Sequence, residues 1–207
     1  MSEIASLAPV LSAERLAGAH SYSAYRQLLD GLMAQNRTTG ATQTDELVQY
    51  THLNIQRMQR IDKTVELLPE LRTALAALPA HYVWLVLTEG WCGDAAQVLP
   101  VLEAVAQASA GRLTTHYLLR DEHLDLMDRY LTNGSRAIPK LIVLHADTLT
   151  EVAHWGPRPA PALELAARLK QEGVSHDDFL LQLHGWYAKD HTLSTQRELL
   201  ELLRGLL

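Results

Sequence analysis

The chain has 207 residues, of which 47% are apolar and 20% are charged, as in an ordinary globular protein. This composition excludes a disordered or low-complexity chain, and no apolar run reaches the ~20 residues that a membrane-spanning helix needs. Lysine and arginine number 18 against 24 aspartate and glutamate, so the net charge of −6 argues against nucleic acid as a partner. No membrane partner is expected either.

Residues 1–80 predict a helical N-terminal extension. Apolar residues recur at steps of three and four over 22–33 and over 47–65, which places each set on one helix face. Pro69 is predicted to open a further helix that runs to residue 78. Asn54 is the polar member of the second apolar stripe, and we expect it to be buried and to fix the packing register.

Residues 81–173 predict a domain of the α/β class. The segment 82–88 is almost continuously apolar and β-prone, which is typical of a strand buried on both faces. In chain order we then expect a helix at 92–109, a strand at 113–119, a helix at 122–131, strands at 140–145 and 150–155, and a helix at 161–172. This β-α-β-α-β-β-α order needs crossover connections, and it predicts a mixed sheet covered by helices.

Residues 174–207 predict a C-terminal helical extension. Ser175 and Asp178 resemble a capping box, and 190–194 is predicted to be a linker. The last helix has an apolar face of leucines. We expect this extension and the N-terminal one to pack on the α/β domain.

Cys92 is the only cysteine, which excludes an internal disulfide and a multi-cysteine zinc site. It lies in Trp91-Cys92-Gly93-Asp94, at the predicted turn from the first strand into a helix. Unpaired N–H groups at the start of a helix favour the thiolate, so we expect the pKa of Cys92 to fall. The carboxylate of Asp94 acts in the opposite direction, and the sequence does not rank the two effects. The ten histidines are scattered without ligand spacing, so neither a metal nor a cofactor is expected.

These residues resemble the thioredoxin superfamily, whose members open a helix with W-C-G-P-C. The further matches are Pro100, eight residues after the cysteine, the segment Arg136-Ala137-Ile138-Pro139, and Gly156 after the last strand. The resemblance covers residues 81–172. It implies a thioredoxin-like fold, a cis peptide bond before Pro139, and a position for Pro139 opposite Cys92.

Over the whole chain, W-C-G-D-A-A, N-x-x-R-M-x-R-x-D-K and W-Y-A-K-D resemble an uncharacterised bacterial group of single-cysteine thioredoxin-family proteins. Ala95 stands where the superfamily has its resolving cysteine, and Val86 stands where it buries an aspartate. A mixed disulfide on Cys92 therefore has no second thiol in the chain to resolve it.

The leading hypothesis is thiol-disulfide exchange through Cys92, resolved by an external thiol. Its partner would be a protein or a low-molecular-weight thiol or disulfide. By resemblance, the substrate groove would be formed by Trp91, Gly93, Asp94, Ile138 and Pro139. Two candidate supporting residues are Glu89, as an acid or base, and Arg136, which could pair with Asp94 or with an anionic thiol. The start of the sequence, Met1-Ser2-Glu3-Ile4, has no basic region and no signal-like core. Together with the single cysteine, this predicts a cytoplasmic protein.

Two alternatives remain open. One is a redox-inactive thioredoxin-fold module that binds protein segments, and a weaker one is a thiol-dependent peroxidase or transferase.

A basic row on the second helix also has two interpretations, with Arg57, Arg60 and Lys63 as its members. It is either a solvated face or, if it borders Cys92, a means of lowering the thiol pKa and attracting anionic thiols. The oligomeric state is not predicted.

Overall fold

The computed structural model describes residues 11–207. The first ten residues, whose sequence predicts no secretion signal, lie outside the described part. The strands form one sheet in the order β2-β1-β3-β4. Their bounds are Tyr82–Thr88 for β1, Leu113–Leu119 for β2, Lys140–His145 for β3 and Glu151–Trp155 for β4. β1 runs parallel to β2 and antiparallel to β3, and β3 is antiparallel to β4, so the predicted mixed sheet is confirmed.

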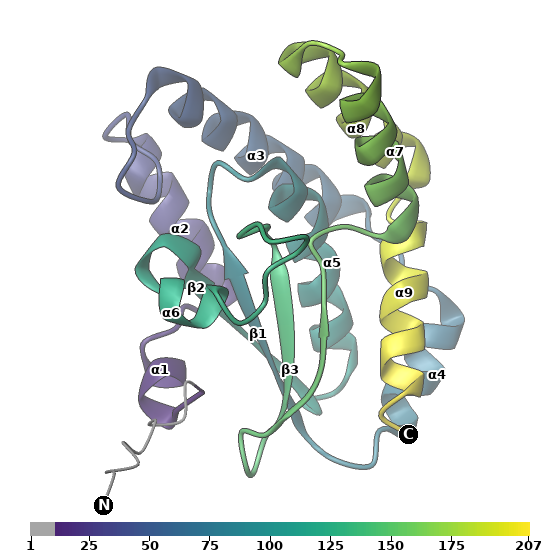
Figure 1. Cartoon of the computed structure of the whole chain (residues 1–207). Helices are drawn as coiled ribbons and strands as arrows, with labels where there is room; N and C mark the ends of the chain where they lie inside the picture. Colours follow the sequence, from purple (N-terminus) through teal and green to yellow (C-terminus); the bar gives the residue numbers. More distant parts are fainter. Residues whose placement is uncertain (1–10) are drawn as a thin grey trace, which may run out of the picture.

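Helices precede, interrupt and follow the sheet (Figure 1). Before it come α1 (Ala13–Ala17), α2 (Tyr22–Met33), α3 (Asp45–Thr64) and α4 (Pro69–Ala77); within it come α5 (Gly93–Ala108), the 3-10 turn η1 (Arg120–Glu122) and α6 (Leu124–Met127); after it come α7 (Ala160–Glu172), α8 (His176–Asp190) and α9 (Leu193–Arg204). The helix predicted over 122–131 is wrong in extent. His123 has non-helical backbone angles of −132° and 49°, and it separates η1 from the single turn of α6.

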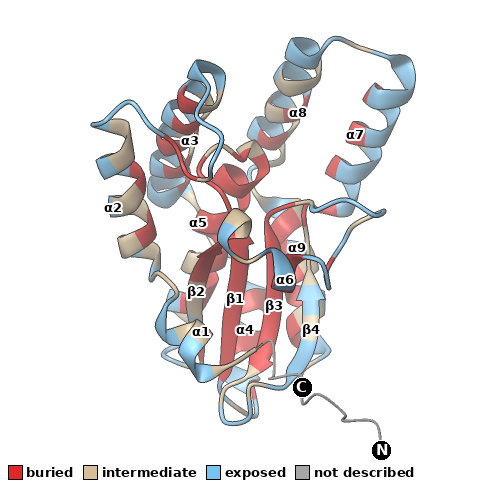
Figure 2. Ribbon diagram, turned by 60° about the vertical axis from the view of Figure 1, so that its left-hand side comes forward, coloured by how far each residue is buried: buried red, intermediate tan, exposed pale blue. Residues whose placement is uncertain are grey.

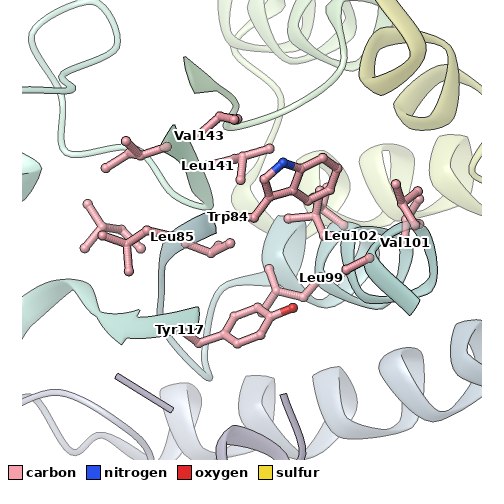
Figure 3. Close-up of a cluster of buried hydrophobic side chains, with 14 of the residues drawn as sticks. Trp84, Leu85, Leu99, Val101, Leu102, Tyr117, Leu141 and Val143 are labelled. Carbon is pink, nitrogen blue, oxygen red and sulfur yellow. The ribbon is translucent and has the colours of Figure 1, made fainter. Parts of the chain in front are cut away.

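The core explains why β1 is continuously apolar. Every residue of β1 is buried, and the apolar cluster around it includes residues of α5, of α6 and of the N-terminal helices. Figure 3 shows Trp84 beside Leu102 of α5, and the hydroxyl of Tyr117, from β2, reaches Glu103 of the same helix. The same apolar cluster takes in buried residues of α2, α3, α4 and α9. The two extensions therefore share one hydrophobic core with the sheet.

The α7–α8 hairpin stands apart from that core. Its own small cluster consists of Ala162, Leu183 and Tyr187, and no described residue of either helix belongs to the main apolar cluster. α9 instead packs beside α4, where Leu199 and Leu203 are fully buried. In Figure 2, α3 and α8 rise on either side of the end of the sheet where α5 begins. Residues of α3, of α8 and of the first turn of α5 line a common groove at this end of the sheet.

Within residues 11–207, no helix combines the length and the apolar character that crossing a membrane requires.

Candidate functional site

Cys92 is the N-cap of α5, and it contacts the segment that ends in Pro139. Its sulfur accepts a hydrogen bond from the backbone N–H of Ala95, at 3.4 Å, as a capping side chain does. Its thiol donates to the backbone carbonyl of Ile138, at 3.3 Å, although the two residues are 46 positions apart. The peptide bond between Ile138 and Pro139 is cis. The sulfur therefore lies against the segment that the resemblance places opposite it.

Burial dominates the electrostatics of the thiol. Cys92 is only 8% exposed, and this burial, followed by the charge of Asp94, raises the pKa of Cys92 to about 12. The Ala95 N–H and the charge of Arg158 act in the opposite direction but do not compensate. The predicted fall in the thiol pKa is therefore wrong. The sequence shows the start of the helix, but it does not show how deeply the sulfur is covered.

Asp94 is the centre of a buried polar cluster. Arg158, from the loop after β4, pairs with its Oδ2 at 2.6 Å, and the Tyr187 hydroxyl of α8 donates to its Oδ1 at 2.9 Å. The suggested pairing of Asp94 with Arg136 is wrong. Both Nε and Nη2 of Arg136 donate instead to the carboxylate of Asp128, at 2.6 and 2.9 Å. In a bidentate pair of this kind, two N–H groups of the guanidinium bind the two oxygens of one carboxylate.

Trp91 and Glu89 take different places around the cysteine. Trp91 is partly exposed and carries the guanidinium of Arg120 over its ring, 4.7 Å from the ring centre. The side chain of Glu89 is fully buried and accepts from the N–H of Asp121, at 2.9 Å, so it anchors η1. Burial raises the pKa of Glu89. Its role as an acid or base at the thiol stays a prediction, and its side chain does not line the groove described next.

A groove of about 800 Å³ has Cys92 among its lining residues. One wall is α3, the other is α8, and the floor is the Cys92 turn together with Ala137 and Ile138. Of the predicted groove residues, the lining includes Trp91, Gly93, Asp94 and Ile138, whereas the side chain of Pro139 is not part of it. Arg136 also lines it. The volume is typical of a small-molecule site.

Gly93 explains how closely α8 approaches the cysteine. A Cβ at residue 93 would lie 2.7 Å from the imidazole of His184 and 3.9 Å from Nη1 of Arg57, so only glycine leaves room for the imidazole. Nη1 of Arg57 donates to Oδ1 of Asn54, at 2.7 Å, and Nδ2 of Asn54 donates to the carbonyl of Gly90, at 2.9 Å. Asn54 is fully buried, as its place in the apolar stripe predicts.

Gly156 is fixed by a second close approach. Its φ is +111°, and a Cβ there would lie 2.4 Å from the carbonyl oxygen of Pro139. The ammonium of Lys140 donates to the Gly156 carbonyl, at 2.9 Å. These contacts hold the end of β4 against the start of β3, and they place Arg158 two residues later beside Asp94.

Three residues of the site were not predicted: Arg158, His184 and Tyr187. They follow Cys92 by more than sixty positions and belong to no motif with known spacing. Tyr187 lies in the W-Y-A-K-D segment, one of those that resemble the single-cysteine group, but nothing in that segment predicts a contact with Asp94. Burial and the charges of Arg57 and Arg158 lower the pKa of His184 to about 4, so the imidazole is neutral at pH 7. Within residues 11–207, no three His, Cys, Asp or Glu side chains are grouped so that they could hold a metal ion.

Comparisons with known proteins concern the fold and the family of the chain. The solved structures that the chain resembles include a crystal structure of an HIV epitope-scaffold, with a TM-score of 0.60 and 17% identity over 93% of this chain and 97% of that one. They also include a protein of unknown function from Pseudomonas aeruginosa, with a TM-score of 0.58 and 17% identity over 91% of this chain and 99% of that one. At this identity the likeness concerns the fold alone, and its coverage extends beyond the sheet domain. No match was found among curated proteins. A family model described as thioredoxin matches residues 40–170, which is more than half of the chain, and the chain therefore belongs to the thioredoxin family.

Proposed function

We propose that the protein exchanges thiols and disulfides through Cys92 alone, with a low-molecular-weight disulfide as the oxidant and an external thiol as the reductant. The observation that carries the proposal is the groove, because its lining includes Cys92, the only cysteine of the chain. Its walls, α3 and α8, favour a small ligand over a flat protein surface. Trp91 and the cis segment at Pro139 would shape the ligand site.

The exchange would proceed in two steps. The Cys92 sulfur attacks one sulfur of the bound disulfide, its proton passes to solvent, and the departing sulfur takes the electron pair of the broken S–S bond. A thiol from solution then attacks the mixed disulfide and returns Cys92 to its reduced form. The second step must come from outside, because Ala95 replaces the family's second cysteine.

The raised pKa of Cys92 sets the speed of this reaction. The thiolate is the attacking species, so at neutral pH only a small fraction of the protein would react at any moment. The rate is expected to rise about tenfold per pH unit up to the pKa of Cys92. Such a protein would act slowly in a reducing compartment such as the cytoplasm.

A second candidate is a redox-inactive binding module. The observation that favours it is the burial of Cys92, since a covered and protonated thiol reacts poorly with soluble disulfides. In this case the groove would bind its ligand without forming a bond to sulfur. Only the first candidate forms a disulfide adduct on Cys92, and this adduct can be measured.

The test is intact-mass spectrometry after incubation with 2-hydroxyethyl disulfide at pH 8. We expect one mercaptoethanol adduct on the native protein, removable by free thiol, with a rate that saturates with disulfide concentration because the ligand binds first. Since the chain has one cysteine, any disulfide adduct is on Cys92. Cys92→Ser is the matched control. A native protein that stays unmodified while the denatured chain reacts fully would support the binding module instead.

A further inference from the structure

The groove concentrates positive charge in a protein whose net charge is −6. Its lining includes two carboxylates, Glu46 and Asp94, and four arginines: Arg57, Arg120, Arg136 and Arg158. Three of the arginines already pair with carboxylates, namely Asp121, Asp128 and Asp94. In the described part of the chain, Arg57 has no carboxylate within 4 Å.

Arg57 is held beside Gly93, at the turn that carries Cys92. Its Nη1 lies 3.9 Å from the Cβ position of residue 93, which directly follows Cys92. Asn54 fixes this guanidinium through one of its five N–H donors and is itself tied to Gly90. The remaining donors of Arg57 have no partner among residues 11–207. A guanidinium with its donors free and its position fixed is suited to a carboxylate.

Glu46 does not neutralise Arg57. Both residues are on α3, but they are eleven positions apart, which is ~16 Å along a helix at 1.5 Å per residue. The Tyr50 hydroxyl donates to the Glu46 carboxylate, at 2.6 Å. The charge of Arg57 is therefore not balanced by a carboxylate of α3.

The upper walls of the groove are apolar. α3 presents Leu47, Tyr50 and Leu53, and α8 presents Phe179, Leu180 and Leu181. Leu53 is 37% exposed and Leu181 is 73% exposed. Apolar side chains facing each other across a groove, with a few polar groups at its base, are typical of a site for an amphipathic small molecule.

We propose that the disulfide taken by Cys92 carries a carboxylate close to its sulfur and an apolar body beyond it. The carboxylate pairs with Arg57, the sulfur faces Cys92, and the apolar part lies between α3 and α8. This inference rests on the proposed function and adds the chemical class of the substrate. The exchange step is the one given above, with the carboxylate unchanged throughout.

The test compares three small disulfides with different end groups: 3,3'-dithiodipropionate, which is anionic, 2-hydroxyethyl disulfide, which is neutral, and cystamine, which is cationic. Each adduct rate at pH 8 is divided by the rate of the same disulfide with the denatured chain, so intrinsic reactivity cancels. We expect the anionic disulfide to react at least about tenfold faster than the neutral one, and the cationic one to be slowest. Added salt reduces the difference, because the attraction is screened.

Arg57→Met should remove the preference for the anionic disulfide, so that its normalised rate falls to about that of the neutral disulfide with the same variant. Arg57→Lys keeps the charge and should keep part of the preference. Arg60→Met is the matched control, because Arg60 is an exposed cation of the same helix that does not line the groove. Equal normalised rates for all three disulfides, or an unchanged preference in Arg57→Met, would overturn this inference and leave the exchange reaction standing. If none of the three modifies the native protein while all modify the denatured chain, the proposed function fails and the inference fails with it.

Discussion

Asp94 controls the charge that Cys92 experiences. Its carboxylate is buried two residues after the cysteine and is the second cause of the raised thiol pKa, after burial itself. Arg158 balances part of that charge at 2.6 Å. The reactivity of the sulfur therefore depends on a pair that the sequence does not connect.

Asp94→Asn should make Cys92 more reactive. The substitution keeps the shape and an acceptor for Tyr187, removes the negative charge, and leaves the cation of Arg158 without its partner. Both changes lower the pKa of Cys92, and one pKa unit raises the thiolate fraction tenfold at a pH below the pKa. We expect alkylation by iodoacetamide at pH 8 to accelerate at least about tenfold, with its pH profile displaced to lower pH.

Tyr187→Phe is the control for Asp94→Asn, because it removes the hydrogen bond but keeps the carboxylate charge. Its alkylation rate should stay within about threefold of the natural protein. Breaking the pair with Arg158 is expected to cost about 3 kcal/mol of stability, so the rates are compared well below the unfolding temperature. An Asp94→Asn protein that is folded but alkylates at the natural rate would show that burial alone sets the pKa.

At the residue scale, the sequence predicted the features that depend on local motifs. The turn at Cys92, the segment ending in Pro139 and the buried Asn54 follow from spacing and resemblance. The pKa of Cys92 and the partner of Asp94 do not, because both depend on side chains brought in from α8 and from the loop after β4. Desolvation is a property of the folded chain, and no local pattern measures it.

At the scale of elements, α8 is held to the rest of the molecule by polar contacts at the site. The Tyr187 hydroxyl donates to Asp94, and Nδ1 of His184 lies 3.2 Å from Nε2 of Gln97 on α5. The hairpin contributes nothing to the main apolar cluster. Periodicity predicted α7 and α8 correctly as helices, but not that α9 rather than α7 would join the main core, since all three have apolar faces.

Acid should loosen α8. The pKa of His184 is about 4 in the folded protein and 6.5 in an open state, so the neutral imidazole stabilises closure above pH 6.5. This contribution is lost as the pH falls from 6.5 towards 4, because a protonated His184 would be a buried charge and would also lie near Arg57 and Arg158. We expect the free energy of opening of α8, from amide hydrogen exchange corrected for intrinsic rates, to fall by about 2 kcal/mol between pH 7 and pH 4.5.

His184→Gln is the matched variant for the acid effect, because it keeps a hydrogen-bonding side chain that does not titrate. Its α8 amides should lose clearly less protection than those of the natural protein over the same range. The amides of β1 serve as an internal reference, since they lie in the main core. Equal losses in the variant and the natural protein would assign the acid effect to carboxylates instead.

At the scale of the whole molecule, the three segments distinguished by sequence texture share one core. Gln196 of α9 accepts from the N–H of Leu68, at 2.8 Å, and donates to the carbonyl of Glu66, at 3.0 Å. These bonds tie the last helix to the start of α4. The boundaries at residues 80 and 173 follow the change from helical to strand periodicity, which reports local structure and not which apolar faces meet.

Leu203→Ala should therefore destabilise the sheet and the terminal helices together. Leu203 is fully buried in the shared core, and removing a buried leucine side chain costs about 3 kcal/mol. Leu207→Ala is the control, because Leu207 is 59% exposed on the same tail, and its effect should stay within about 0.5 kcal/mol. Urea unfolding followed by far-UV circular dichroism and by tryptophan fluorescence should give coincident transitions, both displaced in Leu203→Ala. If the fluorescence transition, to which buried Trp84 contributes, keeps its midpoint while helical signal is lost earlier, the C-terminal extension folds as a separate unit.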